Sequence, residues 1–226
     1  MPDYVTVPTI NYHDATYLIS ASNLEQCPAD TALEVAFVGR SNAGKSSAIN
    51  ALTEQTKLAR TSKTPGRTQL FNFFTLGEER YLVDLPGFGY AKVPPALKRK
   101  WQKELGRYLE QRDSLQGLVL LMDIRHPLKD LDEVIIQWCR QASMPLHILL
   151  TKADKLKQGA AKATLLQVQK TVGEPELITL QLFSALKGDG VKILRKQLNK
   201  WLIPVVEDGA EEARPAPFVA ADTDAS

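Results

Sequence analysis

A phosphate-binding loop offers the first candidate for chemistry. Residues 39–47 read GRSNAGKSS and match G-x-x-x-x-G-K-[ST] through Gly39, Gly44, Lys45 and Ser46. Glycines let backbone N–H groups wrap the phosphates of a nucleotide, and the start of a helix adds partial positive charge. We expect Lys45 to reach the β- and γ-phosphates and the Ser46 hydroxyl to ligate Mg²⁺. The loop therefore predicts a nucleoside triphosphate site.

A second motif, DLPG at residues 84–87, follows an apolar run. We expect the Asp84 carboxylate to hold Mg²⁺ through a water and the Gly87 amide to bond the γ-phosphate. The next residue is Phe88, where Ras-like hydrolases usually carry a glutamine that orients the attacking water. We therefore expect slow intrinsic hydrolysis, and a switch more than a high-turnover enzyme.

Between these motifs lies a polar stretch, ARTSKTPGRTQL at 59–70, without apolar periodicity. A loop in this place can deliver a threonine hydroxyl to the metal, ordering with the γ-phosphate and relaxing when it leaves. Thr64 and Thr68 both qualify from the sequence alone. A simple surface loop is the alternative reading of the stretch.

The base is predicted by TKAD at 151–154, directly after the apolar run HILL. A carboxylate at Asp154 can accept two hydrogen bonds from guanine N1–H and N2–H₂, whereas adenine offers no such donor pair. Lys152 can lay its stem along one face of the base. Further on, SALK at 184–187 follows another strand, and a backbone amide there could meet guanine O6. The set predicts a guanine nucleotide.

Five blocks, GRSNAGKSS, TPGRT, DLPG, TKAD and SALKG, resemble the guanine-nucleotide boxes of the TRAFAC class of P-loop GTPases. More closely, GRSNAGKSS, SKTPGRTQL with FNFF, DLPGFGYAKV and TKADKL resemble the EngB (YihA/YsxC) family of bacterial GTPases, over about residues 20–203. The resemblance implies a cytoplasmic GTPase with Mg²⁺ as cofactor and GTP and GDP as ligands. It further implies a switch in large ribosomal subunit assembly that binds the subunit precursor and its rRNA. A requirement in normal cell division and septation is also implied, and we expect a monomer.

The resemblance also assigns roles to residues. It favours Thr68 over Thr64 as the switch residue on the metal, beside Ser46 and Asp84, and the catalytic residues would be Lys45, Asn42 and Thr68. Thr151 stands where asparagine is usual in GTPases, though threonine is common in this family, and this suggests modest nucleotide affinity. The implied GTP-binding residues are Gly39, Arg40, Ser41, Asn42, Ala43, Gly44, Lys45, Ser46, Gly66, Arg67, Thr68, Gln69, Leu70, Asp84, Leu85, Pro86, Gly87, Thr151, Lys152, Ala153, Asp154, Phe183, Ser184 and Ala185.

Asn42 suggests what replaces the missing glutamine. In related GTPases with N-x-G-K-S, an asparagine there helps hold K⁺ against the phosphates, where the ion acts like an arginine finger. Our hypothesis is that K⁺ or a partner surface accelerates hydrolysis. An ordinary turn residue is the alternative for Asn42, since asparagine is favoured in turns.

The elements that must position these residues follow from apolar runs. Helix-length stretches alternate with near-continuous apolar strands, which indicates a parallel sheet covered on both faces. The Gly77-Glu78-Glu79 link is short enough only for an antiparallel hairpin. We predict an α/β fold: a three-layer Ras-like P-loop GTPase domain with a mostly parallel six-stranded sheet and one antiparallel edge strand. The expected strands are 34–38, 70–76, 80–84, 117–122, 146–150 and 177–183, and the expected helices are 45–52, 95–112, 131–142, 160–172 and 191–202.

Composition sets the frame for this domain. Apolar residues make up 44% and charged residues 24% of the 226, as in ordinary globular proteins, and no apolar run approaches the roughly 20 residues of a bilayer span. The start of the chain does not read as a secretory signal, and the two cysteines match no metal motif. We expect an N-terminal extension at 1–22, the G domain at 23–203, and a disordered, acidic, Ala/Pro-rich tail at 204–226.

A basic segment directly after the metal turn is the candidate partner surface. Its cations face one nearby acid, Glu104, and are mixed with Trp101 and Tyr108, so they could contact RNA phosphates while the rings stack on bases. A solvated amphipathic helix with its aromatics in the core is the alternative. The candidate RNA contacts are Lys92, Lys98, Arg99, Lys100, Lys103 and Arg107.

Two rival functions remain. The first is a GTP-dependent adaptor for cell-division proteins without direct RNA contact. The second, a P-loop kinase acting on a small molecule, is disfavoured because the sequence shows no arginine-rich lid.

Overall fold

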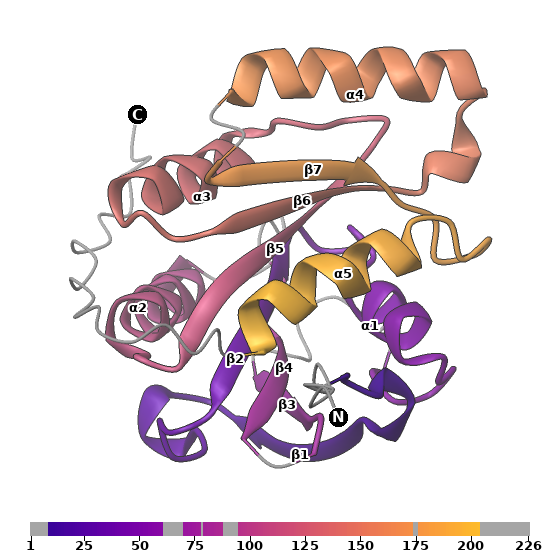
Figure 1. Cartoon of the computed structure of the whole chain (residues 1–226). Helices are drawn as coiled ribbons and strands as arrows, with labels where there is room; N and C mark the ends of the chain where they lie inside the picture. Colours follow the sequence, from indigo (N-terminus) through magenta and orange to yellow (C-terminus); the bar gives the residue numbers. More distant parts are fainter. Residues whose placement is uncertain (1–8, 61–69, 78, 88–94, 174–175, 204–226) are drawn as a thin grey trace, which may run out of the picture.

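The computed structural model describes residues 9–60, 70–77, 79–87, 95–173 and 176–203, with the side chains of 95–102 excepted. Within these residues a seven-stranded sheet forms the middle layer (Figure 1), in the order β1-β3-β4-β2-β5-β6-β7. The strands are β1 (Thr16–Ala21), β2 (Leu33–Gly39), β3 (Phe71–Thr75), β4 (Arg80–Asp84), β5 (Leu115–Asp123), β6 (Leu146–Thr151) and β7 (Ile178–Leu182).

The sheet is mostly parallel, as predicted. β2 pairs in parallel with β4 and β5, and β6 pairs in parallel with β5 and β7. β3 runs antiparallel to β4 after the short link at 76–79, which confirms the predicted hairpin. β2, β4, β5 and β6 are buried along most of their length because helices cover both faces, whereas β7 at the edge of the sheet is only partly buried.

The sequence predicted six strands, and the structure adds β1 beyond β3. This strand lacks the usual alternation because Tyr17, Leu18 and Ile19 are all exposed, at 56%, 43% and 41%. The pairing with β3 shifts register between Tyr17 and Ile19, so Leu18 is the extra residue of a bulge. The residues of β1 lie before position 23, where the sequence places the start of the G domain, yet they are hydrogen-bonded into its sheet.

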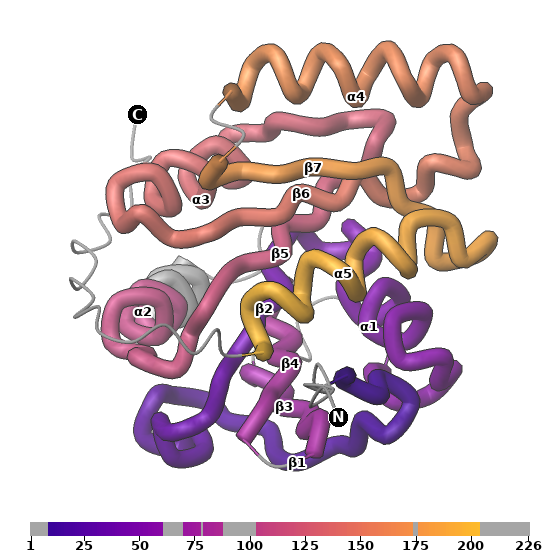
Figure 2. The backbone as a smooth tube through the Cα atoms, viewed as in Figure 1, coloured from indigo at the N-terminus to yellow at the C-terminus, as the bar shows by residue number. Residues whose placement is uncertain are grey.

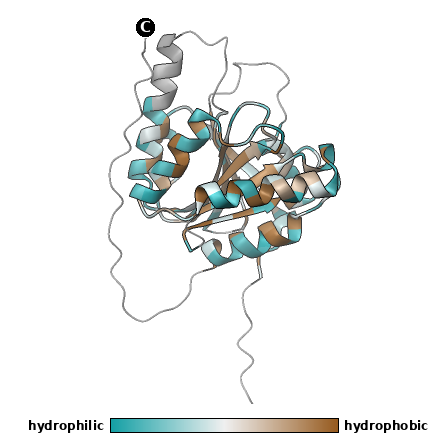
Figure 3. Ribbon diagram, turned by 90° about the horizontal axis from the view of Figure 1, so that it is seen from above, coloured by the Kyte–Doolittle hydropathy of each residue, from teal (hydrophilic) through white to brown (hydrophobic). Residues whose placement is uncertain are grey.

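Two groups of helices complete the layers. On one face α1 and α5 cover β2 and β5, and their Ile49 and Leu198 share a core with Phe37 and Leu121. On the other face lie α2, α3 and α4 (Figure 2), whose buried residues share a second core. Figure 3 shows apolar strands in the middle and hydrophilic outer helix faces. The helices are α1 (Lys45–Thr53), α2 (Pro95–Gln111), α3 (Asp130–Gln141), α4 (Gln158–Val172) and α5 (Val191–Leu202), close to the predicted bounds.

The C-terminal end of α2 is fixed by a buried ion pair. Glu34, at the start of β2, is completely buried, and both its oxygens accept hydrogen bonds from the Arg112 guanidinium. The Tyr108 hydroxyl donates a further hydrogen bond of 2.8 Å to Glu34 Oε2. A carboxylate buried without these donors would be costly, so the three side chains stabilise the fold only together.

None of the described helices combines the length and apolar character that crossing a bilayer requires.

Candidate functional site

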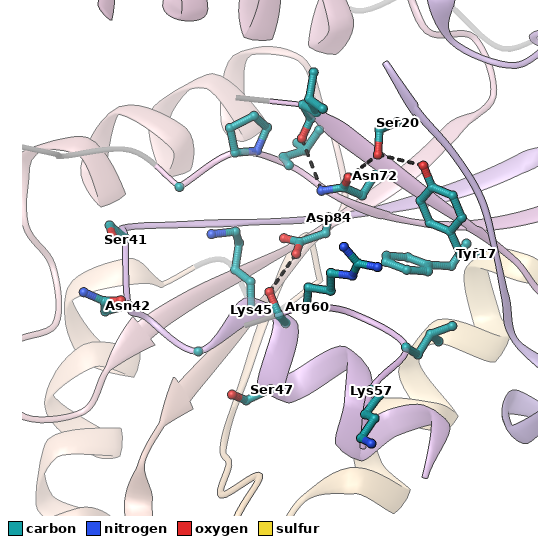
Figure 4. Close-up of a pocket in the computed structure, with 18 of the residues that line it drawn as sticks. Tyr17, Ser20, Ser41, Asn42, Lys45, Ser47, Lys57, Arg60, Asn72 and Asp84 are labelled. Atoms are coloured by element: carbon teal, nitrogen blue, oxygen red, sulfur yellow. Dashed lines mark hydrogen bonds between the residues drawn. The ribbon is translucent and has the colours of Figure 1, made fainter. Parts of the chain in front are cut away.

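A cavity of about 960 Å³ opens where the carboxyl ends of β2 and β4 meet the start of α1. Ligands bind at this edge in open α/β sheets. Its lining brings together the phosphate loop at 41–47, the metal turn at 84–87 and Lys152 of the base motif. Figure 4 shows Lys45 and Asp84 near its centre, with Ser41 and Asn42 on one side and Arg60 and Tyr17 on the other. The volume is in the range of small-molecule sites.

The phosphate loop has the backbone that its glycines predict. Gly44 precedes α1 with φ 103°, a left-handed value that glycine adopts without strain. A Cβ on Gly39 would lie only 2.6 Å from the Leu121 carbonyl oxygen of the neighbouring strand, so a larger residue would push β2 from β5. Asn42 is also left-handed, with φ 62°, which asparagine tolerates. The loop leads directly into the first turn of α1, whose N–H groups have no acceptor within the helix and can bind phosphate oxygens.

Charge is concentrated in the centre of the cavity. Ser46 Oγ donates to Asp84 Oδ2 at 2.9 Å. Burial lowers the pKa of Lys45, an effect that the Asp84 charge opposes. Burial also raises the pKa of Asp84, against the Lys45 charge and the Ser46 hydrogen bond. Both groups thus lack the solvation that ions have in water, and phosphates with a divalent cation would supply the missing charge partners.

Mg²⁺ suits this donor set. Asp84 Oδ1 is buried and has no hydrogen-bond partner among the residues that the structure describes, although the opposite oxygen is bonded to Ser46. A carboxylate and a hydroxyl are the hard oxygen ligands that Mg²⁺ takes beside phosphate oxygens and waters. Ser46 and Asp84, which the sequence predicts as metal residues, are therefore brought together, and the orphaned oxygen is the feature that a hydrated cation would satisfy.

The metal turn packs directly on the phosphate loop. A Cβ on Gly87 would come within 3.0 Å of both Lys45 Nζ and Ser41 Cα. This close approach places the Gly87 backbone against the lysine that the sequence assigns to the γ-phosphate. Leu85, by contrast, has its side chain in the core, so only its backbone is at the turn.

The base motif is tied to the phosphate loop through two side chains. Thr151 Oγ1 donates to the Ala43 carbonyl at 2.7 Å. Lys152 Nζ donates to the Asn42 carbonyl at 2.8 Å. The hydroxyl of Thr151 thus connects the two loops in the place where many GTPases carry an asparagine.

Asp154 is oriented from the loop that follows β7. Ser184 Oγ donates to Asp154 Oδ1 at 2.7 Å, and Lys155 Nζ lies 3.5 Å from Oδ2. The Ser184 hydrogen bond is the main reason that the pKa of Asp154 is lowered. The Phe183 side chain is buried in the core, while its carbonyl accepts the Ala153 N–H at 3.1 Å. An ionised carboxylate held in this way is the acceptor that a guanine edge requires.

Part of the predicted site lies outside the described residues. These positions are Gly66, Arg67, Thr68 and Gln69 of the polar loop, together with Phe88. Leu70, at the loop's end, lines the cavity. Of the basic segment, Lys92 and the side chains of Lys98, Arg99 and Lys100 also lie outside.

The two remaining basic candidates differ from each other. Lys103 is exposed. Arg107 pairs with Glu25 at 2.6 Å and with Glu104 at 3.5 Å, and these contacts raise its pKa. Glu25 lies 82 positions away from Arg107 in the chain. The positive charge of the basic segment is therefore lower than the acids near it in the sequence suggested.

The outer part of the cavity, toward β1 and β3, was not predicted from the sequence. Tyr17 Oη and Ser20 Oγ lie 2.9 Å apart, and Ser20 Oγ donates to Asn72 Oδ1 at 2.6 Å (Figure 4). Lys57 and Arg60 add two cations to the same wall. No motif marks Tyr17 or Ser20; the pairing of β1 with β3 places them beside Asn72 at the cavity.

Comparisons with known proteins agree with this site. A family model described as "50S ribosome-binding GTPase" matches residues 34–152. The chain is 54% identical over 209 residues to a probable GTP-binding protein EngB of Salmonella newport (strain SL254), covering 88% of this chain and 98% of that one. The same identity holds over 203 residues of the Aliivibrio fischeri (strain MJ11) protein, covering 88% and 93%.

A solved structure agrees in fold. The crystal structure of a probable GTP-binding protein engB superposes with a TM-score of 0.61 at 23% identity, covering 75% of this chain and 98% of that chain. Together with the relatives at 54% identity, the matching family model and the nucleotide site, this places the chain in the EngB family of P-loop GTPases.

Proposed function

We propose that this protein is a slow GTPase that acts as a nucleotide-dependent switch in large ribosomal subunit assembly. The proposal is carried by two paired sites and the link between them. Ser46 is bonded to Asp84 beside Lys45, and Ser184 is bonded to Asp154. Lys152, two residues before Asp154, joins the second pair to the phosphate loop through the Asn42 carbonyl. One end suits a metal-bound triphosphate and the other a guanine edge. The description of the family model, a 50S ribosome-binding GTPase, supports the choice of partner.

The chemistry is hydrolysis of GTP to GDP and phosphate by a water in line with the γ-phosphate. Lys45 neutralises charge on the β- and γ-phosphates, and the Gly87 amide holds the γ-phosphate. Ser46 and Thr68 would ligate Mg²⁺, and Asp84 would hold it through a water. The bound Mg²⁺ would neutralise the charge that develops on the phosphates. Since Phe88 cannot orient water, we propose that intrinsic turnover is slow.

K⁺ or a partner surface supplies the missing stimulation in this proposal. Asn42 is the residue that would hold K⁺ against the phosphates, and its left-handed backbone turns the loop at that point. The decisive measurement is GTP turnover in K⁺ and in Na⁺ buffer, each with and without large-subunit particles. We expect stimulation by K⁺ or by particles, and identical rates in all four conditions would contradict the proposed activation.

The RNA contact is proposed for the basic segment at 92–107. Reversing Lys98, Arg99 and Lys100 to glutamate should abolish co-sedimentation with large-subunit particles and leave GTP affinity unchanged. A matched control reverses three exposed lysines of the α4 region, Lys157, Lys162 and Lys170. Binding that survives the first triple variant, or falls equally in both, would contradict an RNA surface at this place.

The salt dependence of particle binding distinguishes the RNA-binding role from the rival role, an adaptor for cell-division proteins. Contacts to RNA phosphates release counterions, so binding to particles should weaken steeply as salt rises. Absence of particle binding at low salt would favour the adaptor. We further propose that the protein works in the cytoplasm as a monomer, and that normal cell division and septation require it.

A further inference from the structure

Asp123, the last residue of β5, has no role in the nucleotide site described so far, yet three groups converge on its carboxylate. Arg125 donates from Nε to Oδ1 at 2.9 Å and from Nη2 to Oδ2 at 2.6 Å. The Arg125 backbone N–H adds a bond of 3.1 Å to Oδ1. Lys152 Nζ lies 2.9 Å from Oδ2. The two-point contact of the guanidinium fixes the plane of the carboxylate.

Lys152 is the group that connects Asp123 to the nucleotide. The same ammonium that contacts Asp123 donates to the Asn42 carbonyl of the phosphate loop. Lys152 thereby joins three segments: the end of β5, the base motif after β6 and the loop that wraps the phosphates. Strand pairing explains the meeting, because Asp123 is the partner of Thr151 in the β5–β6 register.

A lysine in this place needs such an anchor. Its side chain is long and flexible, and ordering it costs rotamer entropy. The Lys152 side chain is 34% exposed, so without a carboxylate beside it the ammonium would be solvated in several orientations. The Asp123 side chain is only 18% exposed and is already ordered by Arg125, so it presents a fixed anion.

We propose that Asp123 is a positioning residue for guanine-nucleotide binding: held by Arg125, it fixes Lys152 on the Asn42 carbonyl, so that the base motif and the phosphate loop meet the nucleotide as one unit. The inference rests on the proposed guanine-nucleotide site. Asp123 acts on the lysine at the face of the base and not on Asp154 at its edge. Loss of Asp123 therefore weakens binding without changing base preference.

The test is a double-mutant cycle on GDP binding, measured with Asp123→Asn, Lys152→Met and the double variant. Asp123→Asn should weaken GDP binding about three- to tenfold, the range for partly exposed charged hydrogen bonds. In the Lys152→Met background the same substitution should change affinity less than twofold, because neighbours that act as a unit are not additive. A threefold or larger loss in both backgrounds, or no loss in the parent background, overturns the proposal.

Three further variants serve as controls for the double-mutant cycle. Asp123→Glu, which keeps the charge, should bind GDP more tightly than Asp123→Asn. Asp130→Asn at the exposed start of α3 is the matched control and should bind like the parent. Arg125→Gln tests the same chain of contacts at a side chain that is 46% exposed, even if Asp123→Asn folds poorly. It should weaken GDP binding only while Lys152 is present, and an unchanged affinity counts against the proposal.

Measurements of base preference distinguish the proposed role of Asp123 from the proposed guanine-nucleotide site on which it rests. The ratio of GDP to IDP affinity should be the same in Asp123→Asn as in the parent, since the contacts at the base edge are intact. If the parent itself fails to prefer GDP over ADP, the guanine site is wrong. If the parent prefers GDP and Asp123→Asn binds equally well, only the role of Asp123 is wrong.

Discussion

The Ser184 hydroxyl donates a 2.7 Å hydrogen bond to Asp154 Oδ1, and this side-chain contact joins the loop after β7 to the loop after β6. It lowers the pKa of Asp154, so the carboxylate is ionised at neutral pH. Ser184 is completely buried, which keeps water from replacing the hydroxyl. The orientation of the guanine acceptor thus depends on a residue 30 positions further along the chain.

Ser184→Ala should therefore weaken GDP binding about five- to tenfold, the effect of losing one hydrogen bond to a charged group. ADP binding should not change, because the contact serves only the guanine edge. Isothermal titration calorimetry measures both ligands. Thr164→Ala removes a hydroxyl that donates to the Ala160 carbonyl within α4, away from the site, and serves as the control. GDP binding equal to that of the parent would show that Ser184 does not orient Asp154.

Ser46→Ala should uncouple nucleotide binding from Mg²⁺. The substitution removes one proposed metal ligand and the hydroxyl that is bonded to Asp84 Oδ2. In the parent, chelating Mg²⁺ should weaken GTP binding at least tenfold, in line with the charge that a divalent ion neutralises. In the variant, binding with and without the chelator should be nearly equal. A full Mg²⁺ effect in Ser46→Ala would exclude this serine as a ligand.

Glu34→Gln should destabilise the protein by up to about 3–5 kcal/mol, because it removes the buried carboxylate and leaves the Arg112 guanidinium only the more distant Asp30, at 3.5 Å. Urea unfolding of the ligand-free proteins measures the loss. Glu25→Gln, which breaks the exposed pair with Arg107, is the matched control and should shift the unfolding midpoint little. Equal shifts in the two variants would mean that the buried pair contributes no more than a surface pair.

His147 should make folding sensitive to mild acid. It lies on β6 with Nδ1 2.7 Å from Thr179 Oγ1 and Nε2 3.0 Å from Gln181 Oε1. Burial lowers its pKa from 6.5 to about 4, so between these values the folded protein binds fewer protons than the unfolded chain. Stability is therefore lost as pH falls from 6.5 to 4, by at most about 3 kcal/mol.

The His147 contribution is isolated by comparison with His147→Gln across this pH range. The pKa of Asp132, raised to about 6 by burial, acts in the opposite direction, but its effect is common to both proteins and cancels in the difference. The stability advantage of the parent over His147→Gln should shrink on acidification. An advantage that is constant from pH 7 to 4 would mean that His147 is not held neutral.

The parts of the site that the sequence predicted are those whose geometry depends on local residue types. Gly44 and Gly87 are glycines because of a left-handed turn and a close approach, and such demands are visible in a motif. The strands of the parallel part of the sheet were predicted in the same way, since their apolar runs are nearly continuous. Strand β1 was missed because its bulge and its exposed Tyr17 break the expected alternation.

Contacts between segments that are distant in the chain could not be predicted from the sequence. The suggestion that Thr151 weakens binding did not anticipate its hydroxyl on the Ala43 carbonyl, which depends on how β6 approaches the phosphate loop. Asp123 likewise gains its place beside Lys152 from the register of β5 against β6. From the sequence, Arg107 was expected to be available for RNA, but in the structure it forms an ion pair with the distant Glu25. These pairings are set by tertiary packing and leave no local signature.

The central claim, that Asp154 selects guanine, is tested most directly by nucleotide competition on Asp154→Asn. Xanthine carries an acceptor where guanine carries its N2 donors, so the amide should exchange the preference. We predict that the variant binds GTP at least tenfold more weakly than the parent and binds XTP more tightly than the parent does. Undiminished GTP binding by Asp154→Asn, with no gain for XTP, would contradict the account.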